Sequence, residues 1–251
     1  MSTTDPLGEI RARRWFYEFD LPDGTRTLSG LPAGVESVHT TRRVMLDAAL
    51  DHAGARDCSG LTAVDLACHQ GWFALHLARR NFASILGVDA RAGHLEDAAL
   101  MARVLGIPTF ATRRLDIEAA AAADIGEHDL TLMLGVLYHL ENPVRALRLA
   151  RAVTRRLLVI ETQVVPHMHG LIEWGAEPRP LQGVFGVVDE TPERHAGEAS
   201  LHGICLAPSA PTLHWMLGRV GFGRVVQIIP PWYGYQQLVR GSRVMFAAFV
   251  E

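Results

Sequence analysis

The feature that most constrains the fold is a regular alternation of short apolar runs and helix-type segments between residues 61 and 162. Five apolar runs fit buried strands, at residues 62–67, 84–89, 108–113, 129–134 and 157–162. The helix that precedes the fifth run has a typical start, with Asn142 at the N-cap and Pro143 at the first helical position. Strands that alternate with helices of this length predict a parallel sheet with right-handed crossovers.

The C-terminal part adds a helix over residues 208–220, ended by Gly221, and two strands at residues 224–229 and 244–250. A strand pair at the end of such a chain is consistent with an antiparallel edge. The predicted fold class is therefore α/β. We expect a Rossmann-like, doubly wound seven-stranded sheet that is mostly parallel and has an antiparallel C-terminal edge hairpin.

The remaining segments surround this predicted sheet. Residues 15–30 read as a hairpin that turns at Pro22-Asp23-Gly24, and residues 41–54 have helical spacing. We therefore divide the chain into an N-terminal hairpin and helix cap (1–55) and a main domain (56–251). Residues 163–207 are rich in Pro, Gly and His without a long periodic run, which indicates a substrate or lid insertion.

Composition excludes several classes of function. All 24 basic residues are arginine, so lysine nucleophiles and Schiff-base chemistry are excluded. A net charge of −3 argues against a general nucleic-acid binder. The 3 cysteines form no C-x-x-C pair, and no apolar run reaches the ~18 residues of a membrane span. We expect a cytoplasmic protein with no membrane contact and with a small-molecule partner.

The stretch VDLACHQGW, residues 64–72, marks the first candidate site. In open α/β sheets, ligands bind beyond the carboxyl ends of the strands, which is where this turn falls. The dinucleotide fingerprint G-x-G-x-x-G is absent, and Cys68 and His69 crowd the backbone N–H groups that a pyrophosphate needs. The turn therefore favours a nucleoside cofactor without phosphates.

Two further acids fit a nucleoside site. Asp89 ends the second strand at about the offset expected for an acid that accepts from two ribose hydroxyls. Asp116 follows the third strand, where it can accept from an adenine amino group while Ile117 covers the ring.

From about residue 60 to its end, the chain resembles the class I S-adenosylmethionine-dependent methyltransferases. Their first motif is an acid followed by x-G-x-G-x-G, which stands here as Asp65-Leu66-Ala67-Cys68-His69-Gln70-Gly71. Ala67 and His69 replace two glycines, and His69 implies either different loop dihedrals or a side chain packed beside the methionine portion of the cofactor. The alternative is another doubly wound domain. The resemblance implies S-adenosyl-L-methionine as cofactor, bound by Asp65, Ala67, Cys68, His69, Gly71, Trp72, Asp89, Ala90, Asp116, Ile117, Leu134 and Gly135.

The catalytic candidates follow the fourth strand, in the run MLGVLYHLENP at residues 133–143. Gly135 lets the backbone pass close to a cofactor, and Tyr138 and His139 stand at the mouth of the predicted site. An alcohol that accepts a methyl group must lose its proton, and histidine is the usual base near neutral pH. We therefore assign His139 as general base. In the alternative, Tyr138 and His139 only pack at the helix start and support the cofactor.

The run GVLYH, with Glu161-Thr162 at the end of the fifth strand, is also similar to the tRNA wobble-uridine carboxymethyltransferases. That family uses a carboxylated relative of the cofactor and holds the added carboxylate partly with a lysine. This chain has no lysine to supply, so the similarity supports the local architecture and leaves the substrate open.

Substrate-binding candidates are Glu161, His167, His169 and Trp174, with Trp174 as part of a lid that excludes water. His167-x-His169 with Glu161 or Glu173 could hold a divalent metal, although histidines that gather by chance on solvated loops are commoner, so no metal is predicted.

Two N-terminal groups leave alternatives open. The aromatic residues 15–17 cover one opening of the site, form a homodimer contact, or pack as an ordinary hairpin. Arg42 and Arg43 attract an anionic acceptor or face water.

The sequence thus predicts an enzyme that transfers a methyl group from S-adenosylmethionine to a hydroxyl of a sugar-like or natural-product molecule. The alternatives are an RNA-modifying (carboxy)methyltransferase and a non-catalytic cofactor-binding protein.

Overall fold

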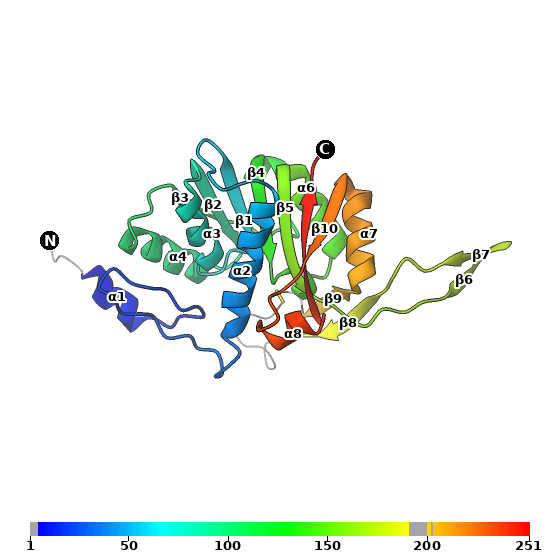
Figure 1. The fold of residues 1–251 in the computed structure, drawn as a ribbon, viewed down its shortest axis with the longest axis horizontal. Helices are drawn as coiled ribbons and strands as arrows, with labels where there is room; N and C mark the ends of the chain where they lie inside the picture. Colours follow the sequence, from blue (N-terminus) through cyan, green and yellow to red (C-terminus); the bar gives the residue numbers. More distant parts are fainter. Residues whose placement is uncertain (1–4, 191–199, 202) are drawn as a thin grey trace.

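The fold is built on one seven-stranded sheet, seen near the centre of Figure 1. The computed structural model describes residues 5–190, 200–201 and 203–251. The strand order is β10-β11-β5-β4-β1-β2-β3. The strands are β1 (Thr62–Leu66), β2 (Ser84–Asp89), β3 (Phe110–Arg114), β4 (His128–Leu134), β5 (Thr154–Gln163), β10 (Arg224–Ile228) and β11 (Arg243–Phe249).

The strand directions confirm the predicted fold class. The strands β1 to β5 pair in parallel, whereas β11 runs antiparallel to both of its neighbours, β5 and β10. The order reverses between β1 and β4, so this is the point where an open α/β sheet offers a ligand crevice.

Helices cover both faces of the sheet (Figure 1). One hydrophobic cluster joins a face to α2, α3 and α4, and a second joins the opposite face to α6 and α7. The helices are α1 (Pro6–Ala12), α2 (Ser37–His52), α3 (Trp72–Leu77), α4 (Ala92–Val104), α5 (Ala122–Ile125), α6 (Pro143–Val153), α7 (Ala210–Val220) and α8 (Gln236–Val239), with 3-10 turns η1 (Ala78–Arg80) and η2 (Leu137–His139). Among the described residues, none of these helices has the length and apolar character to cross a membrane.

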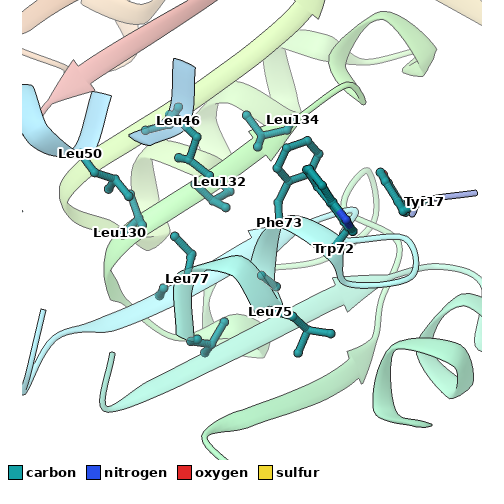
Figure 2. Close-up of a cluster of buried hydrophobic side chains, with 14 of the residues drawn as sticks. Tyr17, Leu46, Leu50, Trp72, Phe73, Leu75, Leu77, Leu130, Leu132 and Leu134 are labelled. Atoms are coloured by element: carbon teal, nitrogen blue, oxygen red, sulfur yellow. The ribbon is translucent and has the colours of Figure 1, made fainter. Parts of the chain in front are cut away.

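The central strand β4 shows why its sequence is a nearly continuous apolar run. Leu130, Leu132 and Leu134 point into the first cluster, while Met133 points into the second. Figure 2 shows the three leucines beside side chains from α2 and α3. A strand that is buried on both faces needs apolar residues at successive positions rather than an alternation.

The segment at 163–207 differs from the sequence-based expectation of a run without clear elements. It contains the hairpin β6 (Leu171–Trp174) and β7 (Glu177–Pro180), and the pair β8 (Phe185–Asp189) and β9 (Ile204–Pro208). The hairpin extends away from the sheet in Figure 1, and all eight of its strand residues are exposed. These strands have only four or five residues, and two of the four residues of β7 are prolines. Such strands are too short for an alternation of apolar and polar residues to be recognised in the sequence.

The N-terminal segment also differs in detail. The hairpin expected at residues 15–30 forms only a tight turn with one isolated antiparallel bridge, between Asp20 and Arg26. Trp15 and Tyr17 are buried in the same cluster as the sheet, and the homodimer stays a prediction. The predicted boundary at residue 55 remains a prediction.

The turn after β1 has positive φ angles, which favour glycine, at three positions, and only one of the three is a glycine. The φ angles of Ala67, His69 and Gly71 are 62°, 52° and 79°, all in the left-handed region. His69 thus has a backbone conformation that glycine adopts without strain. An L-residue in this region costs roughly 1–2 kcal/mol, so the chain holds two strained residues at the predicted cofactor loop.

Leu132→Ala should strongly destabilise the fold, because Leu132 is fully buried in the middle of the sheet. We expect the free energy of unfolding to fall by about 2–5 kcal/mol in urea titrations. Leu28→Ala is the control, since Leu28 is 85% exposed and should change the value by less than ~0.5 kcal/mol. Equal effects of the two substitutions would contradict this core.

Ala67→Gly should stabilise the protein, because glycine adopts a positive φ without strain. The gain should be about 0.5–1 kcal/mol after the extra chain entropy of glycine is subtracted, visible as a rise in Tm. Ala63→Gly is the matched control, since Ala63 lies buried in β1 with no positive φ and its loss should lower Tm. A lower Tm for Ala67→Gly would show that the loop conformation is different.

Candidate functional site

A cavity of about 660 Å³ lies beyond the carboxyl ends of the strands, where the strand order reverses. A volume of this size is typical of small-ligand sites. The structure places ten of the predicted site residues on its wall: Ala67, His69, Asp89, Ala90, Asp116, Ile117, Leu134, Gly135, Tyr138 and His139.

Four other predicted cofactor residues lie behind the wall and support it. Asp65 and Cys68 are buried beneath the loop, and burial together with the nearby Asp89 raises the pKa of Asp65 to about 8. The ring of Trp72 stacks on Tyr17 at 5.6 Å and its N–H donates to the carbonyl of Glu18. A Cβ at Gly71 would lie 3.0 Å from the Cβ of Ala98, so glycine allows α4 to pack against the loop.

Asp89 organises the loop around it. Its carboxylate accepts hydrogen bonds from the backbone N–H groups of His69 and Arg91, both at 2.9 Å, and lies 3.3 Å from Nδ1 of His94. Burial alone would raise its pKa, but the bond with His94 and these backbone bonds lower it. The acid is therefore ionised on the cavity wall, and its oxygens have lone pairs left for further donors such as ribose hydroxyls.

The ring of His69 supports the second interpretation of this residue, in which the side chain packs at the site. It lies 3.7 Å from the ring of His94 and 5.0 Å from that of Phe16, measured between centroids. His69 lines the cavity from the loop after β1.

At the other end of the cavity, residues 115–118 form the turn after β3. Leu115, Asp116, Ile117 and Glu118 all lie on the wall. Asp116 accepts from the backbone N–H of Glu118 at 2.9 Å, which fixes the turn. An acid beside an apolar side chain fits the edge and face of an adenine ring.

The N-terminal segment closes one side of the cavity. Gln70, from the loop after β1, accepts from the N–H of Phe16 at 2.8 Å and donates to the carbonyl of Arg14 at 3.0 Å and to Asp97 at 2.8 Å. Phe16 and Tyr17 line the cavity beside the loop. These contacts fit the expectation that the aromatic residues cover an opening of the site.

A buried ionic group lies beneath the cavity. Glu161 is fully buried, and its two oxygens lie 2.9 Å from Nε of Arg42 and 2.7 Å from Nε of Arg243. Burial would raise the pKa of Glu161, but the two guanidinium groups lower it. Glu161 was expected to bind the acceptor. Instead it orients two arginines, because its oxygens are occupied and out of reach of the cavity.

The catalytic candidates line the cavity between β4 and α6. Tyr138 accepts from Nη2 of Arg243 at 3.3 Å, and the guanidinium of Arg243 lies 4.9 Å from the centre of its ring. His139 lies in the 3-10 turn η2 with its side chain 14% exposed. Its Nδ1 lies 2.5 Å from Oε2 of Glu190, and both residues face the cavity.

Glu190 is the main residue that sequence reasoning missed. Besides His139, its Oε2 accepts from the backbone N–H of Ser200 at 3.0 Å and from Sγ of Cys205 at 3.2 Å. Burial would raise its pKa, but these donors, His139 foremost, lower it to about 2, so Glu190 is ionised. Glu190 follows a short strand that the sequence did not reveal, far from His139 along the chain, so no local pattern could have found it.

The remaining predicted substrate residues lie away from the cavity wall. His167 lies near Ser209, with Nδ1 3.3 Å from Oγ, and Trp174 lies on the exposed hairpin with 59% of its surface accessible. Within residues 5–190, 200–201 and 203–251, one group combines three side chains of metal-ligand type, His139, Glu190 and Cys205, whose ligand atoms lie within 4.8 Å of one another. Among those same residues, this group includes neither His167 nor His169.

Sequence comparison identifies the central part of the chain. Residues 64–157 match a methyltransferase domain. A tRNA U34 carboxymethyltransferase from Marinobacter nauticus is 28% identical over 179 residues, which cover 68% of this chain. The chain spans about half the length of that relative, 47%.

Solved structures share the fold. The N-terminal domain of EvdMO1, determined with S-adenosylhomocysteine and D-fucose, is 20% identical with a TM-score of 0.69 and covers 97% of this chain and 94% of its own. The [4+2]-cyclase SpnF is 15% identical with a TM-score of 0.57, over 98% of this chain and 92% of its own. The matched domain and the sheet order together support the resemblance to class I S-adenosylmethionine-dependent methyltransferases.

Proposed function

We propose that the protein transfers a methyl group from S-adenosylmethionine to a hydroxyl group of a small molecule. The observation that supports this most directly is the His139–Glu190 pair on the wall of the cavity. A positioned imidazole beside an ionised carboxylate is suited to remove a proton from an alcohol.

The cavity wall fits the cofactor. Asp89 has acceptor capacity for ribose hydroxyls, Asp116 and Ile117 fit an adenine, and the left-handed loop at Ala67 and His69 brings its backbone to the wall. When bound, S-adenosylmethionine supplies a methyl group on a sulfonium that is already activated toward a nucleophile.

The protein then has to hold the acceptor hydroxyl and accept its proton. Nδ1 of His139 lies against the carboxylate of Glu190, and we assign the role of proton acceptor to the imidazole of His139. A bound S-adenosylmethionine would supply the methyl group and would keep the electron pair of the broken sulfur–carbon bond, while the imidazole of His139 would accept the proton of the hydroxyl. The charge of Glu190 stabilises the resulting imidazolium.

The acceptor side of the cavity favours a small molecule over a polymer. It is lined by aliphatic side chains, including Leu31, Val35, Val165 and Val188, around the His139–Glu190 pair. The N-terminal segment lines one side of this cavity through Phe16 and Tyr17. The similarity to the EvdMO1 domain, whose structure includes D-fucose, supports a sugar-like acceptor.

Two alternatives have weaker support. The relative that modifies tRNA supports an RNA substrate, whereas the net charge of −3 argues against one. The similarity to a cyclase shows that this fold also occurs in a protein described by another reaction, which leaves room for a cofactor-binding protein without transfer. An assay of methyl incorporation into sugars, natural-product alcohols and tRNA separates the three.

His139→Ala should remove the base while leaving the cofactor side intact. Turnover with the alcohol found in the acceptor screen should fall by ~10²–10⁴-fold, and the affinity for S-adenosylhomocysteine should stay within about twofold of wild type. His214→Ala on the exposed face of α7 is the matched control and should change neither value. Wild-type turnover in His139→Ala would exclude the base role.

Glu190→Gln should impair the base through its orientation and charge. We expect kcat to fall about 10–100-fold with KM nearly unchanged. The rising limb of the pH profile of kcat should move toward lower pH, because an amide stabilises an imidazolium less than a carboxylate does. Glu190→Asp should recover part of kcat. A lower kcat with an unmoved pH profile would indicate a purely structural residue.

A further inference from the structure

The guanidinium of Arg42 on α2 is buried against the cavity, yet most of its donors have no acceptor. Its side chain is 8% exposed, and its ion pair runs from Nε to Glu161 at 2.9 Å. In the ranges that the structure describes, neither Nη1 nor Nη2 of Arg42 is hydrogen-bonded. A Cβ on Gly135 would lie 3.1 Å from Nη1 and 3.3 Å from Nη2, so glycine makes room for these two nitrogens at the wall.

The buried group of Arg42, Arg243 and Glu161 carries more positive than negative charge. The carboxylate of Glu161 is shared with Arg243, which donates to it at 2.7 Å and 3.3 Å. Two buried cations therefore face one buried anion, and both arginines lie on the cavity wall while Glu161 does not. An excess buried charge is costly unless a partner compensates it, so the arrangement suits an anionic ligand.

His39 adds a second unpartnered group one turn earlier on α2. Its side chain is 3% exposed and lines the cavity, and among the described residues its Nε2 has no hydrogen-bond partner. Burial, and then the charge of Arg42, lower its pKa to about 2, so the ring is neutral. A neutral imidazole can donate one hydrogen bond to an anion beside Arg42.

We propose that Arg42 and His39 form a carboxylate-binding site on the cavity wall. The inference rests on the proposed use of S-adenosylmethionine. A guanidinium fork matches the two oxygens of a carboxylate, and such a pair is among the stronger polar contacts in a protein. Arg43, next in the sequence, instead lies over the ring of Trp72 at 5.4 Å, outside the cavity.

Two sources could supply the carboxylate: the amino-acid portion of the cofactor or the acceptor. The ring of Phe16 lies 5.0 Å from the rings of both His39 and His69, so the site adjoins the loop after β1. This position favours the cofactor.

Calorimetry with two ligands tests the first source. S-adenosylhomocysteine has the carboxylate, whereas 5′-methylthioadenosine has the same nucleoside and sulfur without it. Arg42→Gln should lower the affinity for S-adenosylhomocysteine by about 10- to 100-fold and the affinity for 5′-methylthioadenosine by less than about twofold. Arg42→Lys, which keeps the positive charge, should lower the affinity for S-adenosylhomocysteine less than Arg42→Gln does. Arg43→Gln is the matched control and should leave the ratio of the two affinities as in wild type.

A second titration tests the acceptor as source. Wild-type protein saturated with S-adenosylhomocysteine is titrated with benzoate and with benzamide. A preference for benzoate that disappears in Arg42→Gln assigns the site to the acceptor, and it supports the proposal. An unchanged affinity ratio in Arg42→Gln and Arg42→Lys, without any benzoate preference in wild type, overturns it. Wild-type protein that binds neither nucleoside would instead overturn the proposed cofactor on which the inference rests.

Discussion

The buried ion group of Glu161, Arg42 and Arg243 joins three distant parts of the chain at the base of the cavity. Glu161 lies near the end of β5, Arg42 on the N-terminal helix α2, and Arg243 at the start of the last strand. Removal of Glu161 would leave two buried guanidinium groups without compensation, which typically costs several kcal/mol. Such a group adds little net stability over a well-packed apolar core. Its effect is to fix the position of α2 against the carboxyl ends of the strands.

That position of α2 determines the character of the site. Helix α2 and the segment before it bring Phe16, His39 and Arg42 to a cavity whose other walls come from the sheet loops. Gln70 ties the same segment to the loop after β1 by hydrogen bonds to the backbone at residues 14 and 16. The N-terminal segment therefore acts as a structural part of the site. It lines the region where the cofactor is proposed to bind.

The fold and the cofactor side of the site could be read from the sequence because their signals are local. Each strand and helix of the sheet is a periodic run, and Asp65, Asp89 and Asp116 occur at fixed places after those runs. The acceptor side could not be read in the same way. Glu190 meets His139 only because the β8–β9 pair folds back beside η2, and strands of five residues give no clear periodicity.

His69 and Arg42 show most directly what could not be inferred from the sequence alone. His69 stands where a glycine is usual, and the sequence left two explanations open. Its φ of 52° lies in the left-handed region, and its ring lies at the cavity wall beside that of His94. Arg42 and Arg43 are equivalent in the sequence, yet helix geometry turns one into the cavity and the other over Trp72. By itself the sequence determined the sheet and its helices, because these depend on hydrophobic periodicity, and it predicted residues at strand ends that line the cavity. Only the tertiary structure decided which polar groups meet, because Arg42, Glu161, Glu190 and Arg243 are distant along the chain and come together through packing.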